Sequence, residues 1–327
     1  MQFVYTYSFY GIFLALYLKS KREKVTVISS SDDVLSACGV LNLPTVRIQY
    51  YSYGDLILKR RSLIAEIDKI KKILENDLLH FSHLQYDLFC FTLITNLIRT
   101  GFQVQFDEIE MIYPKAKLHE ILSIKNLFLL LQLILFRICY NVPIKLSKIS
   151  SSLVTQLNLS KFNNFSNFSV ASYSEDFEDV KTKLIMENQI KLNPIRNVFI
   201  EQSFGLNDSI IEKKTYEIVL ECLSNFEVSI KPHPNNKLKK PLSNITVLPG
   251  YLPVEFLFSN VTNAVISVNS LSLINASKNN NLYAISIMEL LRWKDNNYKI
   301  KTKEFLINKS GNKILFPKTL FELEESL

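Results

Sequence analysis

Glycine is scarce in this chain. Seven glycines occur among 327 residues, and only Gly11, Gly39 and Gly54 fall in the first hundred. Neither G-x-G-x-x-G nor G-x-x-x-x-G-K-[ST] is present. In those patterns the glycines let the backbone approach and cradle phosphates. Their absence excludes the standard glycine-rich nucleotide-binding loops, so a nucleotide would have to be held in another way.

Cysteine is also scarce, and no two cysteines form a C-x-x-C pair. The four cysteines are Cys38, Cys90, Cys139 and Cys222. The histidines have no companion cysteines at zinc spacing, and no D-x-D motif is present, so no metal site is expected. Because the cysteines are far apart and mostly in apolar segments, we expect buried free thiols in a reducing, cytoplasmic compartment.

No apolar run is long enough to span a membrane. The run LFLLLQLILF at 127–136 has ten residues, whereas a spanning helix needs about 20. The charges of the N-terminal apolar stretch follow it instead of preceding it, which is not the order of a secretion signal. The run at 127–136 predicts either a buried core helix or a segment that rests on an anionic membrane surface.

Positive charge is in excess, with a formal net charge of +7. Basic residues form short runs at 19–24, 59–61, 69–72 and 237–240. Such runs are typical of a solvated face, of a site for an anionic substrate, or of a surface that meets an anionic membrane. They lie on separate predicted elements and accompany no nucleic-acid-binding motif, so we expect no nucleic-acid partner.

Short β-like runs alternate with helical periodicity in the first half of the chain. Residues 110–140 read as helical, and residues 141–180 are rich in Ser, Asn and Phe with weak periodicity. The alternation predicts a parallel sheet covered by helices on both faces. Residues 141–180 are interpreted as a domain junction. The predicted strands are 2–7, 24–29, 45–51, 78–85 and 102–108, and the predicted helices are 9–21, 55–78 and 88–101.

A second α/β pattern begins at Pro194. Ser209 and Glu212 have the spacing of a capping box at the start of its long helix. The expected fold class is therefore α/β, with two Rossmann-like domains facing a cleft, at 1–180 and 181–327. The predicted strands are 197–202, 227–230, 244–249, 264–268 and 282–287, and the predicted helices are 209–225 and 253–260.

One histidine stands between two prolines, in SIKPHPNN at 229–236. A residue before proline is driven into extended geometry, and proline fixes its own φ, so Lys231 and His233 should both be held extended. The segment follows a predicted strand, and ligands of open α/β sheets bind beyond the carboxyl ends of the strands. His233 is therefore either a rigidly mounted phosphate donor with Lys231 beside it, or part of a simple turn.

Three further segments join IKPHP in one pattern. LPVEFLF carries Pro253 and Glu255, AVISVNSLSL carries Ser270, and VFIEQSFGLNDSIIEKK places an acidic loop between a strand and a helix. Together they resemble glycosyltransferase family 52, the bacterial sialyltransferases of lipooligosaccharide and capsule synthesis. The resemblance covers roughly residues 195–290, and before 190 only the α/β layout agrees.

The sequence departs from the family pattern at two places. The family's paired serines are represented by Ser270 and Leu271, with the next hydroxyl at Ser272. In FDEIEMIY, Ile109 stands where the family's acidic motif has glycine. These departures leave open whether Asp107 or the loop at 201–208 supplies the catalytic base.

The resemblance implies the two-domain GT-B architecture and a metal-independent, cofactor-free, inverting transfer. N-acetylneuraminic acid would move from CMP-sialic acid to a terminal galactoside of a bacterial surface glycan, with an α-2,3 linkage expected. The N-terminal domain would take the acceptor and the C-terminal domain CMP. Such a transfer needs a carboxylate base and donors to the departing phosphate.

Residue by residue, the resemblance implies Asp208 as the general base, with Glu201 and Asp107 as alternatives. It implies His233 as the acid or phosphate donor. The implied substrate-binding residues are Lys231 for charge, Pro234 within the His-Pro motif, Glu255 for ribose or cytosine, Ser270 with Ser272 in reserve for phosphate, and Asp107.

Other interpretations share the same layout. The chain is alternatively a GT-B glycosyltransferase of capsule or lipopolysaccharide synthesis that uses a different nucleotide sugar. It is alternatively a non-catalytic protein that binds a nucleotide or glycan. A monomer and a homodimer both remain open, as does a peripheral position on the inner face of the cell membrane.

Overall fold

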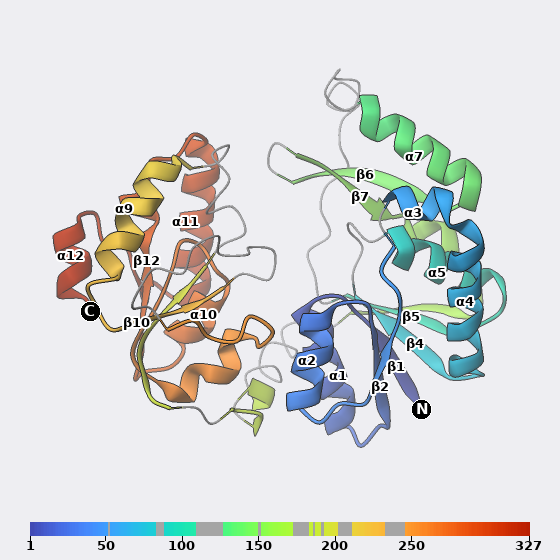
Figure 1. Cartoon of the computed structure of the whole chain (residues 1–327), viewed down its shortest axis with the longest axis horizontal. Helices are drawn as coiled ribbons and strands as arrows, with labels where there is room; N and C mark the ends of the chain where they lie inside the picture. Colours follow the sequence, from blue (N-terminus) through green and yellow to red (C-terminus); the bar gives the residue numbers. More distant parts are fainter. Residues whose placement is uncertain are drawn as a thin grey trace. The chain divides into compact units, whose positions relative to one another are not determined.

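The computed structural model describes residues 1–51, 53–82, 88–108, 127–149, 152–172, 183–185, 187–190, 193–201, 211–232 and 246–327. The chain divides into two compact units, Met1–Leu184 and Ile185–Leu327. Each unit is built around its own parallel sheet with helices packed on it (Figure 1). The predicted α/β class with two Rossmann-like domains is confirmed.

The main sheet of unit 1 contains six strands within the described residues, in the order β3-β2-β1-β4-β5-β8. All of its strand pairs are parallel. This is a doubly wound order, which reverses direction between β1 and β4. The strands are β1 (Gln2–Tyr5), β2 (Val25–Ser29), β3 (Thr45–Arg47), β4 (Leu78–Phe81), β5 (Val104–Glu108) and β8 (Phe168–Ser172).

The helices of unit 1 cover both faces of this sheet (Figure 1). Helix α4 turns Leu63, Ile67, Ile70 and Leu74 toward the core, as its helical spacing predicts. This core also contains residues of α5 and alternate side chains of β1, β4 and β5, while α1 and α2 lie on the other face. The helices are α1 (Phe9–Ser20), α2 (Asp32–Val40), α3 (Tyr53–Leu58), α4 (Arg60–Leu74), α5 (Leu88–Arg99) and α7 (Leu127–Tyr140).

Gly11 permits a close approach between the first strand and the first helix. A Cβ atom at this position would lie 2.2 Å from Cβ of Thr6 and 2.4 Å from its Oγ1. Thr6 is fully buried, so its side chain has little room to move. Glycine is therefore the residue that lets α1 begin directly over the end of β1.

Much of the segment interpreted as a junction, residues 141–180, folds as part of unit 1. The strands β6 (Ile144–Ile149) and β7 (Ser152–Leu157) form an antiparallel hairpin, and η2 (Leu159–Phe162) follows. Strand β8 then joins the main sheet beside β5. Leu157 and Phe162 are buried in the unit-1 core. The segment looks weakly periodic because β6 and β7 form a small separate sheet and β8 is an edge strand of mixed polarity.

The sheet of unit 2 has the order β10-β9-β11-β12-β13 within the described residues, again with parallel pairing throughout. This is the second common doubly wound order, and its direction reverses between β9 and β11. The strands are β9 (Ile195–Ile200), β10 (Val228–Lys231), β11 (Val261–Ser267), β12 (Tyr283–Ser286) and β13 (Ile314–Leu315). The helices are α9 (Lys213–Leu223), η3 (Val254–Asn260), α10 (Ser272–Ser277), η4 (Ile287–Leu290), α11 (Asn296–Ser310) and α12 (Leu320–Glu325).

The predicted capping box of the long unit-2 helix is wrong. Glu212 is itself the N-cap residue of α9, and its side chain makes no capping hydrogen bond; Ser209 lies outside the described residues. The helix starts later than predicted because Ile211 forms an isolated β-bridge with Trp293, which holds it in extended geometry.

The strand predicted at 244–249 is not a regular strand in its described part. Val247 forms only an isolated bridge with Ile230, bracketed by the hydrogen bonds Ile230 N to Thr246 O and Leu248 N to Ile230 O. Pro249 follows, and because it has no N–H it cannot extend the ladder.

Candidate functional site

The carboxyl ends of the unit-2 strands meet at one edge of the sheet, since all of them run parallel. Strand β9 ends at Ile200, β10 at Lys231 and β11 at Ser267. The hydroxyl of Ser267 donates to the carbonyl of Ile200 at 2.9 Å, which joins β9 and β11 at the point where the strand order reverses. In doubly wound sheets this point is where ligands bind.

Three of the sequence-predicted residues come together near this edge. Ser272 Oγ donates to Glu255 Oε1 at 2.6 Å, and Asn275 Nδ2 donates to the same oxygen at 3.3 Å. Ser270 Oγ accepts from the backbone N–H of Ser272 at 3.2 Å. The short distance between Ser272 and Glu255 is typical of a charge-assisted hydrogen bond. No hydrogen bond from a described residue reaches the second oxygen, Glu255 Oε2.

The turn that carries Glu255 is held through its backbone. Gln189 Nε2 donates to the Glu255 carbonyl at 3.0 Å, and Gln189 Oε1 accepts from the N–H of Ser259 at 3.0 Å. The flanking side chains Val254, Phe256 and Leu257 are buried. Glu255 is therefore fixed from both its backbone and its side chain, which is the pre-organisation that a binding residue needs.

Asn269 is a candidate residue that the sequence did not single out. It lies between β11 and α10, directly before Ser270. Its Nδ2 donates to the Tyr298 hydroxyl at 3.3 Å, but its Oδ1 is buried and has no hydrogen-bond partner among the described residues. A buried acceptor without a donor is costly. The feature of the sequence that could have pointed to Asn269 is its position in the turn after a central strand.

Lys231 is buried at the end of β10, with 4% of its surface exposed. Its Nζ donates to the carbonyl of Gly250 at 2.9 Å and to that of Pro232 at 3.2 Å. A Cβ on Gly250 would lie 3.4 Å from Pro232 Cγ. Lys231 thus ties the chain at Gly250 to the start of the His-Pro segment.

Several predicted residues are not placed. Asp208, His233 and Pro234 lie outside the described residues. Glu201, the alternative base, directly follows β9; it is buried, and its backbone N–H donates to the Lys231 carbonyl at 3.0 Å.

Asp107 lies in unit 1, at the carboxyl end of β5, and is fully buried. Its Oδ2 is 3.0 Å from His80 Nδ1, and its Oδ1 accepts from Gln105 Nε2 at 2.8 Å. His80 Nε2 in turn lies 2.7 Å from Gln2 Oε1. These side chains form a polar chain across β1, β4 and β5.

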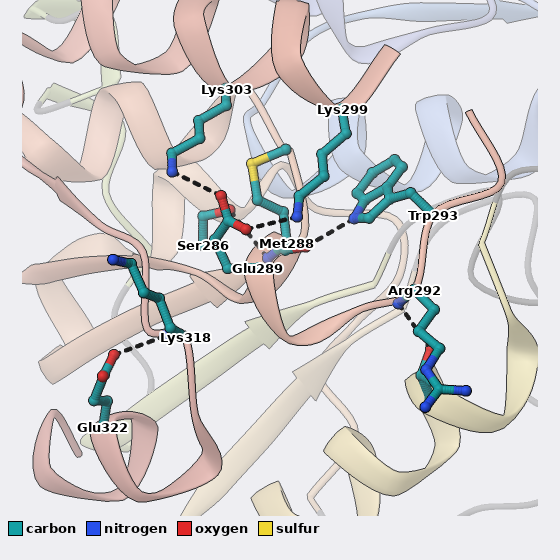
Figure 2. Close-up of polar contacts among 10 residues, drawn as sticks. Ser286, Met288, Glu289, Arg292, Trp293, Lys299, Lys303, Lys318 and Glu322 are labelled. Carbon is teal, nitrogen blue, oxygen red and sulfur yellow. Dashed lines mark hydrogen bonds and ion pairs between the residues drawn. The ribbon is translucent and has the colours of Figure 1, made fainter. Parts of the chain in front are cut away.

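A second carboxylate of unit 2, Glu289, was not predicted from the sequence. It lies in η4, which follows β12, and binds Lys299 Nζ at 2.6 Å and Lys303 Nζ at 2.7 Å (Figure 2). Burial alone would raise the pKa of Glu289, but the hydrogen bonds from the two lysines outweigh it and lower the pKa. Trp293 Nε1 also donates to the Met288 carbonyl at 2.7 Å (Figure 2). The two lysine contacts fasten η4 to α11.

The four cysteines all lie in the described ranges and are free thiols; Cys38 and Cys90 are buried, and the other two are half-buried. Burial raises the pKa of Cys38 to about 12, so this thiol is unreactive near neutral pH. Within the described residues, no group of three His, Cys, Asp or Glu side chains could hold a metal ion. In the same part of the chain, no helix has the length and apolar character needed to cross a membrane.

No model of a known protein family matches the chain, and no curated protein matches it. Among solved structures, it is similar to the UDP-GlcNAc 2-epimerase of Methanocaldococcus jannaschii, with 12% identity, a TM-score of 0.44, and 99% of this chain and 90% of that one covered. It is similar to a spinosyn forosaminyltransferase, with 10% identity, a TM-score of 0.41, and coverage of 99% and 98%. It is similar to an α/β-galactoside α-2,3-sialyltransferase of Photobacterium phosphoreum, with 11% identity, a TM-score of 0.39, and coverage of 96% and 97%. These scores and identities are too low to assign a function.

Proposed function

We propose that the chain is an inverting sialyltransferase that moves N-acetylneuraminic acid from CMP-sialic acid to a terminal galactoside of a bacterial surface glycan. The observation that supports it is the 2.6 Å hydrogen bond between Ser272 and Glu255. It joins the two segments, LPVEFLF and AVISVNSLSL, that carry the resemblance to family 52. They meet near the carboxyl edge of a doubly wound sheet, where such folds bind ligands.

Glu255 offers an acceptor near this edge that suits the donors of CMP. Its Oε2 lacks a donor among the described residues. CMP offers two ribose hydroxyls and a cytosine amino group. We therefore assign Glu255 to the ribose or the base, and the Ser270 hydroxyl to the phosphate.

In the proposed reaction, the acceptor hydroxyl oxygen attacks the anomeric carbon of sialic acid, and the bond from that carbon to the CMP phosphate oxygen breaks. Asp208 takes the proton of the hydroxyl. The electron pair of the broken bond stays on the phosphate, where His233 and the Ser270 hydroxyl would donate to the growing charge. The proposal includes no metal or cofactor. It places CMP in unit 2 and the acceptor in unit 1.

The test is release of CMP from CMP-sialic acid by the full chain, with lactose as acceptor and a matched reaction without acceptor. The proposal expects release that depends on lactose. A parallel thermal-unfolding series with CMP, UMP, UDP and GDP identifies the nucleotide, because a ligand at a hundred times its Kd stabilises the folded protein by about 2.7 kcal/mol.

The outcomes separate the alternatives. Stabilisation by UDP or GDP but not by CMP would assign the chain to a glycosyltransferase with another donor. Stabilisation by CMP without transfer to any galactoside would favour a non-catalytic binding protein. No stabilisation by any of the four nucleotides would contradict the proposal.

A further inference from the structure

Helix α7 is apolar on all sides, yet one of its faces is exposed. Apart from one glutamine and one arginine, every residue of its sequence LFLLLQLILFRICY is hydrophobic. A helix with this composition is ordinarily buried on every side, whereas a surface helix turns polar residues outward. In α7, Leu133 and Phe136 are buried, but Ile134 and Ile138 are 53% and 74% exposed. One described face of α7 therefore lies in the core and another lies outside it.

The exposed face carries one positive charge beside its two isoleucines. Ile134, Arg137 and Ile138 stand three and four residues apart, which places them side by side on a helix. All three are exposed. The isoleucines leave apolar surface in contact with water, which is unfavourable. The arginine can lay its methylene groups along an apolar surface while its guanidinium stays at a polar boundary. This combination suits the boundary between an apolar and a polar phase.

The start of α4 adds to this surface at the end of α7 (Figure 1). The guanidinium of Arg60 lies 5.7 Å from the ring centre of Tyr140, and Ile64 lines the same hollow as Tyr140. Ile64 is exposed, and Leu58, two residues before Arg60, is 85% exposed. We call the combined surface the α4–α7 surface; it consists of Leu58, Arg60, Arg61, Ile64, Ile134, Arg137 and Ile138.

The α4–α7 surface is positively charged as well as apolar. Among the described residues, the arginines that pair with a carboxylate are Arg47 and Arg292. No described carboxylate therefore neutralises Arg60, Arg61 or Arg137. An anionic bilayer offers partners for both parts of this surface, since its phosphates bind guanidinium groups and its acyl chains accept apolar side chains. A second copy of the chain does not, because a two-fold contact would set the same positive surface against itself.

We propose that the α4–α7 surface docks unit 1 on an anionic lipid bilayer. The isoleucines of α7 and Leu58 enter the zone between the headgroups and the acyl chains, and the arginines bind the headgroup phosphates. The contact is peripheral, because no helix of the described residues is long and apolar enough to cross a membrane. The proposal does not rest on the proposed sialyl transfer, since it uses other residues and another partner.

The test is co-sedimentation of the full chain with vesicles of phosphatidylcholine, with and without phosphatidylglycerol. The chain should bind the vesicles that contain phosphatidylglycerol, and added salt should weaken this binding. The double variant Ile134→Gln with Ile138→Gln should bind them about tenfold or more weakly, because less apolar surface is removed from water. Ile300→Gln is the matched control, since Ile300 is an exposed isoleucine on helix α11 of unit 2, and it should bind as the unmodified chain does. The melting temperatures of these variants should not fall, because the replaced side chains are exposed.

The charge requirement has its own matched pair. Arg137→Gln should weaken binding to the anionic vesicles about fivefold. Arg22→Gln removes the same charge from exposed Arg22, in the basic run 19–24, and should leave binding unchanged. Equal losses in these two variants would mean that only the net charge attracts the chain, and would overturn the proposal. Failure to bind anionic vesicles at low salt, or undiminished binding by the double isoleucine variant, would overturn it as well. Self-association in sedimentation velocity that Ile138→Gln abolishes, with vesicle binding intact, would assign the face to a second copy instead.

Discussion

Replacing Glu255 by glutamine should weaken CMP binding while leaving unit 2 folded. Glu255 Oε1 accepts from Ser272 and Asn275, and a glutamine carbonyl oxygen can accept from both. Only Oε2, which accepts no hydrogen bond from a described residue, changes, from a carboxylate oxygen to an amide donor. A hydrogen bond to a charged group is worth about 1.5–3 kcal/mol, so the Kd for CMP should rise about 10- to 150-fold. The free energy of unfolding should fall by less than about 1 kcal/mol.

Glu289→Gln is the matched control, because it is the same change in the same unit. Both oxygens of Glu289 are occupied by lysines, and the side chain is 19% exposed. In Glu289→Gln the amide nitrogen would face one of the two ammonium groups, so one of these contacts and the negative charge are lost. We expect a loss of about 1–3 kcal/mol in the free energy of unfolding, and a Kd for CMP within twofold of that of the unmodified chain.

The two variants are compared by urea unfolding and by calorimetric titration with CMP. The reasoning requires opposite patterns, with affinity lost in Glu255→Gln and stability lost in Glu289→Gln. If Glu255→Gln unfolds readily yet binds CMP as tightly as the unmodified chain, Glu255 only fastens η3 to α10, and its assignment to the nucleotide is refuted.

Further predictions concern pH, packing, turnover and location. The folded-state pKa of Glu289 is lowered from 4.5, so its contribution to the free energy of unfolding is present above pH 4.5 and is lost as the pH falls through the folded-state pKa. The stability difference between the unmodified chain and Glu289→Gln should therefore shrink in urea titrations at acid pH. Gly11→Ala should cost about 1–3 kcal/mol through the clash with Thr6, whereas Gly39→Ala, with nothing within 4 Å, should not destabilise the chain in thermal unfolding. His233→Ala should lower the transfer rate about 10²–10³-fold without changing the melting temperature. In hydrogen exchange, CMP should protect unit 2; protection confined to unit 1 would contradict the domain assignment.

Local patterns in the sequence were sufficient for the fold class and most of the central elements. Helix α4 has buried residues at the positions that its 3.6-residue spacing indicates, and the strands of both sheets are short apolar runs between helices. Such patterns can be read locally because they report which face of an element is buried. The sequence also indicated that Glu255 and the turn at Ser270 lie near each other, since each belongs to a motif beside the same sheet edge.

Other features depend on contacts between residues far apart in the chain. Trp293 holds Ile211 extended and delays the start of α9, and β8 acquires its place only by pairing with β5. Glu289 is clamped by lysines one and more helical turns into α11. Asn269 Oδ1 has no hydrogen-bond partner among the described residues because of the elements that pack around it. A side chain's own neighbours in sequence determine its face and periodicity, but whether its polar atoms find partners is decided only when distant elements pack.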